Sequence, residues 1–272
     1  MTGQRVLKPG VTCWQVAHAP RFRLIVDAAD YFKALKQAMT HAERTIFLIG
    51  WDFDFRIHLT HEKASHDWPD MLGQFMTALV DRKPDLEIRL LKWNLGALRS
   101  LGRGASLLFE LGWMARKRVH TKLDFTYPTG ASHHQKIVVI DDALAFCGGI
   151  DTTTGRWDTR RHRPKDKRRN SPWGFAQGPW HDATAAVDGE AARALGVLAR
   201  ERWFLSTGEL LPPPKPVADR WPGLLEPTFT DVDVAIARTL PAYNGHLPVH
   251  EIEALYLAAI SAARQSIYLE SQ

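Results

Sequence analysis

Four consecutive β-branched residues, Ile137 to Ile140, constrain the fold of this chain more than any other stretch. Polar residues border the run, from His133 to Lys136 on one side and at Asp141 on the other. A short apolar run between polar ends predicts a buried strand. Ala145 to Cys147 predicts a second apolar strand, antiparallel to the first. The polar residues are therefore expected at the end of an inner strand of a sheet.

The polar entry to this strand combines an imidazole with an ammonium group. Because side chains alternate along a strand, His134 and Lys136 are expected to point the same way and Gln135 the opposite way. An imidazole acts as a nucleophile or proton carrier near neutral pH, and a lysine adds a positive charge with several donors. An anion with a leaving group fits both, and phosphate esters are the most obvious such substrates.

Residues after the strand extend the candidate site. Gly148 and Gly149 remove side-chain bulk near the imidazole, so a ligand can approach the backbone closely. Asp141 stands at the strand end, where it is better placed to orient a neighbour or close the turn than to attack. The pattern H-x-K-x4-D alone arises by chance at roughly the per cent level in a chain of this size. Its combination with the apolar filling and the glycine pair favours a functional site.

At these residues the chain resembles the phospholipase D superfamily, whose signature is H-x-K-x4-D followed by G-G-x-[N/D]. Gly149 to Asp151, Gly155 to Thr159 and Pro179 to Asp182 are similar to the phosphatidylcholine-hydrolysing branch rather than to the short nuclease branch. The resemblance covers most of residues 45–272. It implies two such motifs, one per lobe, that meet at one site, where one histidine forms a phosphohistidine and the other protonates the leaving alcohol.

The resemblance also implies roles for individual residues. His134 becomes the nucleophile or its acid partner, Lys136 a phosphate ligand and Asp141 an orienting group. Asp151 and the glycine pair support the phosphate. No metal and no other cofactor is expected for this mechanism.

Helical and extended patterns alternate along the rest of the chain. Helices are expected over 27–44, 71–80, 106–117 and 191–204, and strands over 45–51, 87–93, 118–127 and 183–187. Strands separated by helices predict an α/β fold. With the resemblance, this becomes a phospholipase D-like lobe in which a mixed β-sheet is flanked by helices, followed by the start of a second, similar lobe.

A proline run at Leu211 to Pro216 suggests the domain division. Residues 1–210 are expected to form the first catalytic lobe, 211–228 a stiff linker and 229–272 the start of a second lobe. Ala38 to Leu48 aligns without gaps to Ala259 to Leu269, which suggests an internal repeat of a helix that runs into a strand. The sequence ends where the family usually continues towards its second motif, so we expect a truncated, nearly inactive piece; loss of a general acid costs about 10²- to 10⁴-fold.

Eight basic residues crowd the segment 156–169: Arg156, Arg160, Arg161, Arg163, Lys165, Lys167, Arg168 and Arg169. Such dense like charge seldom packs in a core, so the segment is expected to be a mobile loop. It either guides anionic substrate or lipid headgroups to the site or is merely solvated. Neutralising Arg160, Arg161, Arg168 and Arg169 is expected to weaken binding to anionic vesicles.

Other histidines are weaker candidates. His181 and Asp182 could line the pocket, although a structural hydrogen bond of His181 is the simpler interpretation. Another group is spaced like metal ligands: His58, His61, His66 and Asp67. Its polar, loop-like segment lacks cysteine, so an exposed loop is expected and no metal site.

The net charge of +5 indicates an anionic partner. No apolar secretory segment is visible and no run approaches the roughly 18 apolar residues of a membrane span, so a cytoplasmic protein, peripheral to membranes at most, is expected. The expected function is a phosphodiesterase that cleaves or transfers phosphatidyl groups of phospholipids. The alternatives are a cardiolipin synthase-like phosphatidyltransferase, a single-motif homodimeric nuclease, with nucleic acid the less expected partner, and a non-catalytic module that binds anionic membranes or nucleic acid.

Overall fold

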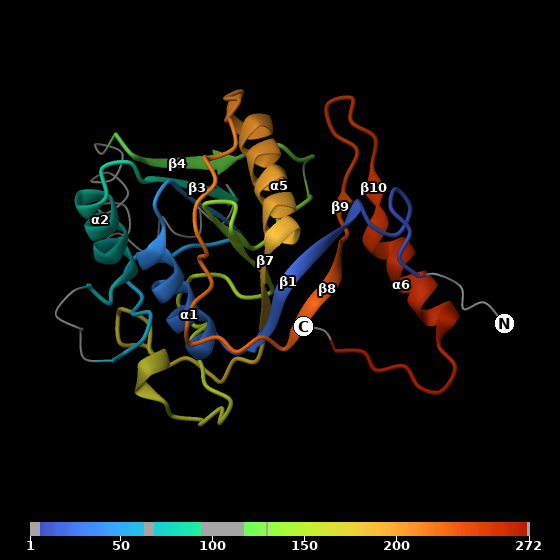
Figure 1. Ribbon diagram of the computed structural model, residues 1–272. Coiled ribbons are helices and arrows are strands. Elements are labelled where there is room, and N and C mark those ends of the chain that lie inside the picture. Colours follow the sequence, from blue (N-terminus) through green and yellow to red (C-terminus); the bar gives the residue numbers. More distant parts are fainter. Residues whose placement is uncertain (1–5, 63–67, 94–116, 129, 271–272) are drawn as a thin grey trace.

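An eight-stranded sheet dominates the computed structural model, which describes residues 6–62, 68–93, 117–128 and 130–270 (Figure 1). Its strands are β1 (Gln15–Val26), β2 (Thr45–Gly50), β3 (Glu87–Trp93), β4 (Val119–Asp124), β5 (Ile137–Ile140), β6 (Leu144–Gly148), β7 (Ala183–Asp188) and β8 (Phe229–Ile236). They lie in the order β4-β3-β2-β5-β6-β7-β1-β8. The β2–β3 and β3–β4 pairs are parallel and the other neighbours antiparallel, which confirms the mixed sheet.

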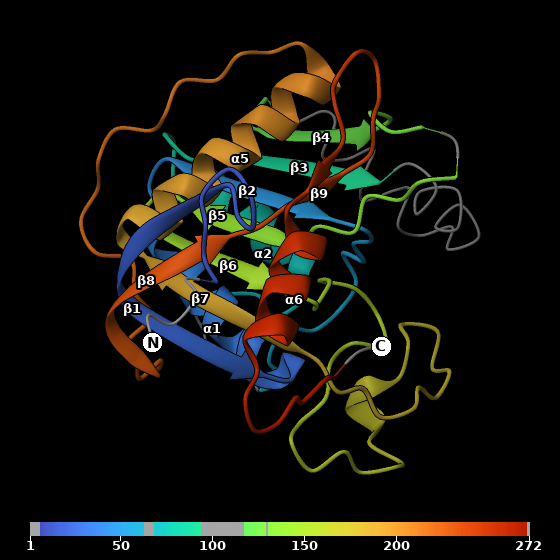
Figure 2. The ribbon, with the colours of Figure 1, turned by 90° about the vertical axis from the view of Figure 1, so that its right-hand side faces the viewer.

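Helices cover both faces of this sheet (Figures 1 and 2). The described helices are α1 (Ala28–His41), α2 (Leu72–Arg82), α5 (Gly189–Thr207) and α6 (Glu251–Ala262). Val138 and Ile140 of β5 belong to the same apolar core as α1 and α2, whereas Ile137 and Val139 belong to the core beneath α5. All four residues of β5 are apolar because both of its faces are buried. The expected α/β fold and the central position of this strand are confirmed.

Two strands near one edge of the sheet have no counterpart in the sequence predictions. β1 is twelve residues long, and Pro20 and two arginines interrupt its apolar pattern. It pairs with β7 on one side and with β8 on the other. β8 lies within the residues assigned to the second lobe, yet it forms the edge of this sheet. The predicted boundary at residue 229 is therefore not a boundary of the sheet.

The proline-rich stretch 211–228 has no regular structure and packs against the sheet domain. Arg220 Nη2 lies 2.6 Å from Glu43 Oε1, and Arg220 Nε lies 3.1 Å from Asp141 Oδ2. Leu225 is also buried in the core beside α1 and α2. A guanidinium anchor and an apolar side chain thus hold this stretch to the first lobe.

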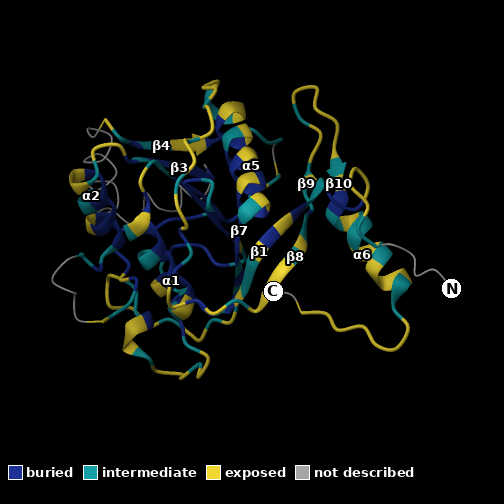
Figure 3. Ribbon diagram, viewed as in Figure 1, coloured by how far each residue is buried: buried dark blue, intermediate teal, exposed yellow. Residues whose placement is uncertain are grey.

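The C-terminal part is the most exposed region of the described chain (Figure 3). A small two-stranded sheet, β9 (Thr239–Leu240) with β10 (Val249–His250), precedes α6. The helical half of the proposed repeat is present in α6, but the strand expected near Ile267 is not, because this segment has no neighbouring strand to satisfy its backbone. The division into two lobes stays a prediction.

Two sequence predictions fall wholly or largely outside the described residues. These are the helix at 106–117, apart from Lys117, and the segment with His66 and Asp67. The other expected helices match α1, α2 and α5, and the expected strands match β2 to β7, with ends that differ by a few residues. None of the described helices is long and apolar enough to cross a membrane.

Candidate active site

The candidate site lies at the start of β5. The strand begins at Ile137, so His134 and Lys136 occupy the non-helical segment just before it. Lys136 is only 7% exposed. Its Nζ lies 3.2 Å from Asp151 Oδ2 and donates a hydrogen bond to the His134 carbonyl oxygen at 3.1 Å. The ammonium group is therefore fixed from both sides, next to the backbone of the candidate nucleophile.

Asp151 links this lysine to the end of β2. Its carboxylate is buried and accepts a hydrogen bond from the Trp51 backbone N–H at 2.9 Å. Burial raises the pKa of Asp151, while the positive charge of Lys136 opposes that rise. The resemblance implied a place for Asp151 near the phosphate; the structure brings its carboxylate to Lys136.

His134 is exposed at the mouth of the site, with its ring edge-on to Trp51 at a centroid separation of 6.4 Å. Partial burial lowers the pKa of His134, and the positive charges of Lys136 and Arg156 lower it further. The carboxylates of Asp151 and Asp182 oppose this change. The net direction keeps the imidazole neutral at physiological pH, with a nitrogen lone pair available for attack.

Two cavities are lined by His134, and a third is lined by its neighbour Trp51. One of about 420 Å³ is lined by His134, Lys136 and Gly148. A second, of about 280 Å³, lies between His134 and Leu240 and has a mainly apolar lining. The third, of about 340 Å³, starts at Trp51, which packs against His134. Two cavities therefore open onto the imidazole.

The glycine pair allows a close approach of neighbouring protein segments. A Cβ atom on Gly148 would lie 2.4 Å from Thr184 Cα, in the adjacent strand β7. A Cβ atom on Gly149 would lie 2.1 Å from Asp182 Oδ1. Glycine is required here because a side chain would displace β7 or Asp182. Asp182 is thereby brought close enough to act electrostatically on His134 and Lys136.

Asp141 lies at the opposite end of β5 from His134. Its carboxylate oxygens accept hydrogen bonds from the backbone N–H groups of Glu43, Arg44 and Thr45, each at 2.8 Å. Arg220 adds an ion pair at 3.1 Å. The structure thus joins Asp141 to the turn before β2 and does not bring it to the imidazole.

A buried ionic network that the sequence did not indicate anchors the residue before His134. His133 Nε2 lies 3.2 Å from Asp124 Oδ2, and Arg202 Nη2 contacts both side chains. Burial lowers the pKa of His133 to about 4, and Arg202 contributes to the decrease. A neutral His133 accepts a hydrogen bond from Arg202, so the network ties β4 and α5 to the segment that carries His134.

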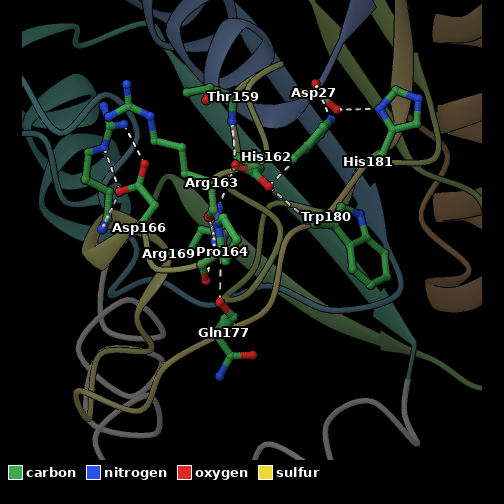
Figure 4. Close-up of polar contacts among 12 residues, drawn as sticks. Asp27, Thr159, His162, Arg163, Pro164, Asp166, Arg169, Gln177, Trp180 and His181 are labelled. Atoms are coloured by element: carbon green, nitrogen blue, oxygen red, sulfur yellow. Dashed lines mark hydrogen bonds and ion pairs between the residues drawn. The ribbon is translucent and has the colours of Figure 1, made fainter.

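His181 lies in a separate group of polar residues (Figure 4). Its Nδ1 lies 2.9 Å from Asp27 Oδ1, as expected from a structural hydrogen bond, and Asp27 raises the pKa of His181. His162 approaches the other oxygen of Asp27 at 3.4 Å. Candidate ligand atoms of Asp27, His162 and His181 all lie within 4.8 Å of one another, so these residues could hold a metal ion.

The basic segment 156–169 is organised around a buried ion pair. Arg169 and Asp158 have fully buried side chains, and Arg169 Nη1 lies 2.7 Å from Asp158 Oδ1 (Figure 4). Arg168 pairs with Asp166 at 2.6 Å. The expectation that these cations do not pack in a core is wrong at Arg169, because Asp158 neutralises its charge. Arg156 lies over the Trp180 ring, 4.0 Å from the ring centroid.

The fold and the site define an α/β protein with a histidine and a lysine at the entry to a central strand. Residues 38–211, more than half of the chain, match the family profile described as Phospholipase D. The chain belongs to the phospholipase D superfamily, as the resemblance of its motifs suggested.

Curated relatives agree with this assignment. The chain is 26% identical over 209 residues to Phospholipase D C of Dictyostelium discoideum, and 27% identical over 283 residues to Phospholipase D A of the same organism. These matches cover 65% and 92% of this chain but only 12% and 21% of the relatives. The chain thus spans about a fifth or less of the length of these relatives.

Solved structures resemble the chain more distantly. NUC from Salmonella typhimurium, a phospholipase D family member, has a TM-score of 0.41 at 14% identity, covering 67% of this chain and 94% of that one. A phosphatidylserine synthase from Haemophilus influenzae has a TM-score of 0.42 at 11% identity, covering 70% and 40% of the two chains.

Proposed function

We propose that this chain carries one catalytic half-site of a phosphodiesterase that acts on phospholipids, with His134 as the nucleophile. The observation that carries the proposal is the neutral, accessible imidazole of His134 beside the fixed ammonium group of Lys136. The names of the curated relatives support phospholipids as the substrate class.

The proposed reaction has two steps. A ring nitrogen of His134 attacks the phosphorus atom, so that a P–N bond forms and the P–O bond to the leaving alcohol breaks. The leaving oxygen takes up a proton. Water or another alcohol then loses a proton and attacks phosphorus, which breaks the P–N bond and restores the imidazole. Lys136 stabilises the negative oxygens of the phosphoryl group in both steps.

The proton for the leaving alcohol has to come from a second group. His133 is a poor donor, because burial lowers its pKa to about 4 and its ring contacts Arg202. We assign the donor to a second motif, on a second lobe or on another copy of the chain. In this arrangement the stretch 211–228 and β8 still belong with the first lobe, and the region that leads to the second motif follows β8.

A substrate with a good leaving group tests His134 as the nucleophile even when the proton-donating group is absent. Bis(p-nitrophenyl) phosphate releases p-nitrophenolate, which leaves without protonation, so His134 is expected to give a burst of up to one equivalent per chain. His134→Ala should abolish the burst. His18→Ala, a control on β1, should retain it. A full burst from His134→Ala in a folded protein would refute the proposal.

Hydrolysis and transfer share the covalent intermediate, so the acceptor decides between them. With a phospholipid and an added primary alcohol, a phosphatidyltransferase yields the phosphatidyl alcohol, whereas a hydrolase yields phosphatidic acid. This assay requires the second proton-donating group. It is therefore carried out on a form of the protein that contains the second motif, or on an oligomer that turns over the phospholipid.

A further inference from the structure

Two aromatic side chains protrude from the loop that follows the basic segment. Trp173 is 57% exposed and Phe175 is 69% exposed, although both are large and apolar. We call residues 171–175 the aromatic tip. The loop that bears them projects away from the sheet (Figure 2). Exposed aromatic residues of this kind mark an interaction surface.

The aromatic tip is held in one conformation by short-range contacts. The Ser171 N–H donates to the Phe175 carbonyl oxygen at 2.8 Å, and the Gly174 N–H donates to the Ser171 carbonyl oxygen at 2.8 Å. Gly174 has a φ of 82°, which glycine adopts without strain. The guanidinium of Arg56 lies 5.2 Å from the Trp173 ring centroid. The two rings are therefore displayed on a preorganised turn.

Exposed cations lie in the same loop. We call the following residues the basic ridge: Arg160, Arg161, Arg163, Lys165 and Lys167. The two acids of this loop are already paired, Asp158 with Arg169 and Asp166 with Arg168. Among the described residues, none forms an ion pair with a side chain of the basic ridge. Lys167 lines the same cavity as Ser171 and Pro172, so the ridge and the tip adjoin.

One groove borders both the aromatic tip and Trp51, the neighbour of His134. Trp173 and Phe175 line this cavity of about 340 Å³ together with Trp51 and Arg156. Trp51 contacts His134, and the charge of Arg156 acts on both His134 and Lys136. A molecule held at the tip therefore has a polar path to the nucleophile.

We propose that the aromatic tip and the basic ridge form a docking surface for an anionic phospholipid bilayer, and that the groove leads the headgroup from this surface to His134. This inference rests on the proposed function, because only a lipid substrate makes such a path useful. Aromatic rings seat at the bilayer interface, and each nearby cation strengthens binding to anionic lipid about fivefold. The aromatic tip suits the apolar interface of an anionic bilayer, and the basic ridge suits its charged headgroups.

A bilayer fits this surface better than a nucleic acid does. Both rings are exposed on one turn of a loop that projects from the sheet, so we expect them to enter a lipid interface together. Stacking of successive bases uses aromatic side chains within a basic groove that tracks the backbone. Single-stranded DNA is therefore the competing ligand in the test.

Cosedimentation with vesicles tests the inference on the whole chain. Phosphatidylcholine vesicles with and without phosphatidylglycerol are the probes, at low and at high salt. We expect binding only to the anionic vesicles, weakened by salt. The double variant Trp173→Ala/Phe175→Ala should lose about tenfold in affinity. Leu210→Ala, which removes a side chain that is 82% exposed outside the loop, is the matched control and should bind normally.

A charge variant separates the two parts of the surface. Arg160→Gln/Arg161→Gln/Arg163→Gln should lose affinity at low salt and little at high salt, whereas the aromatic double variant should lose it at both. Equal thermal melting of all variants shows that they fold.

Other outcomes would overturn the docking surface. These are wild-type protein that ignores anionic vesicles, variants that bind as wild type does, or variants that lose single-stranded DNA but not vesicles. Because vesicle binding needs no turnover, it fails or succeeds independently of the p-nitrophenolate burst.

Discussion

The two ends of β5 carry the two halves of one sequence motif and serve different needs. At the entry, His134 is exposed, and Lys136 meets one carboxylate. At the exit, Asp141 is buried, and its carboxylate meets three backbone N–H groups and a guanidinium. At the exit, the Asp141 carboxylate has all its hydrogen-bond partners within the protein. At the entry, the His134 imidazole remains open to solvent. The comparison shows that one end of the motif holds the sheet together, whereas the other end leaves an imidazole open to solvent.

Removing the carboxylate at the exit should have the largest effect. Asp141→Ala leaves three backbone N–H groups and the buried side of Arg220 without their acceptor. We expect the free energy of unfolding to fall by about 3–5 kcal/mol. Urea denaturation followed by circular dichroism measures it. His134→Ala, at the entry, should change stability by less than about 0.5 kcal/mol. Similar decreases in the free energy of unfolding of the two variants would contradict the different roles assigned to the two ends of β5.

The network beside the entry should make stability depend on pH. The pKa of His133 is about 4 in the folded chain and 6.5 in its ordinary state, so its contribution is complete above pH 6.5 and is lost as the pH falls towards 4. The loss is at most about 3 kcal/mol. His133→Gln cannot bind this proton and should flatten the acid side of a stability–pH curve. An unchanged slope would mean that His133 is not the group responsible.

Charges at the entry should change the pKa of His134, the proposed nucleophile, without unfolding the chain. Lys136→Met removes a positive charge that lowers the pKa of His134, so that pKa should rise. The NMR titration of the His134 ring protons measures it. A pKa that stays or falls would show that the charge of Lys136 does not lower the pKa of His134.

The weakest expected change comes from Arg156. Its charge lowers the pKa of His134 less than burial and Lys136 do, so Arg156→Gln should raise that pKa by less than Lys136→Met. Arg160→Gln, at an exposed position in the same loop, is the control and should leave it unchanged. A larger rise in Arg156→Gln than in Lys136→Met would reverse the assigned order.

The comparison also explains what the sequence could and could not predict. β5 was predictable because both of its faces are buried and its four residues are uniformly apolar. β1 was missed because it mixes arginines and Pro20 with apolar residues beside an edge strand. His134 and Lys136 could be proposed as a pair because the motif places them two residues apart, and their role in catalysis stays a prediction.

Partners that come from distant segments give no such local signal. Arg202 reaches Asp124 across 78 positions, and Asp27 reaches His181 across 154. Asp151 was indicated by its motif, but its ion pair with Lys136 depends on how the glycine-containing end of β6 leads it back to the site. Contacts of this kind are set by the order of strands in the sheet, which short sequence patterns do not specify.

Trapping the covalent intermediate tests the central claim most directly. The chain is mixed with bis(p-nitrophenyl) phosphate, quenched at alkaline pH, where a phosphoramidate survives, and analysed by intact mass and peptide mapping. The account predicts one p-nitrophenyl phosphoryl group on His134, labile in acid and absent from His134→Ala. A stable adduct on another residue, or p-nitrophenolate release that persists in His134→Ala, would contradict it.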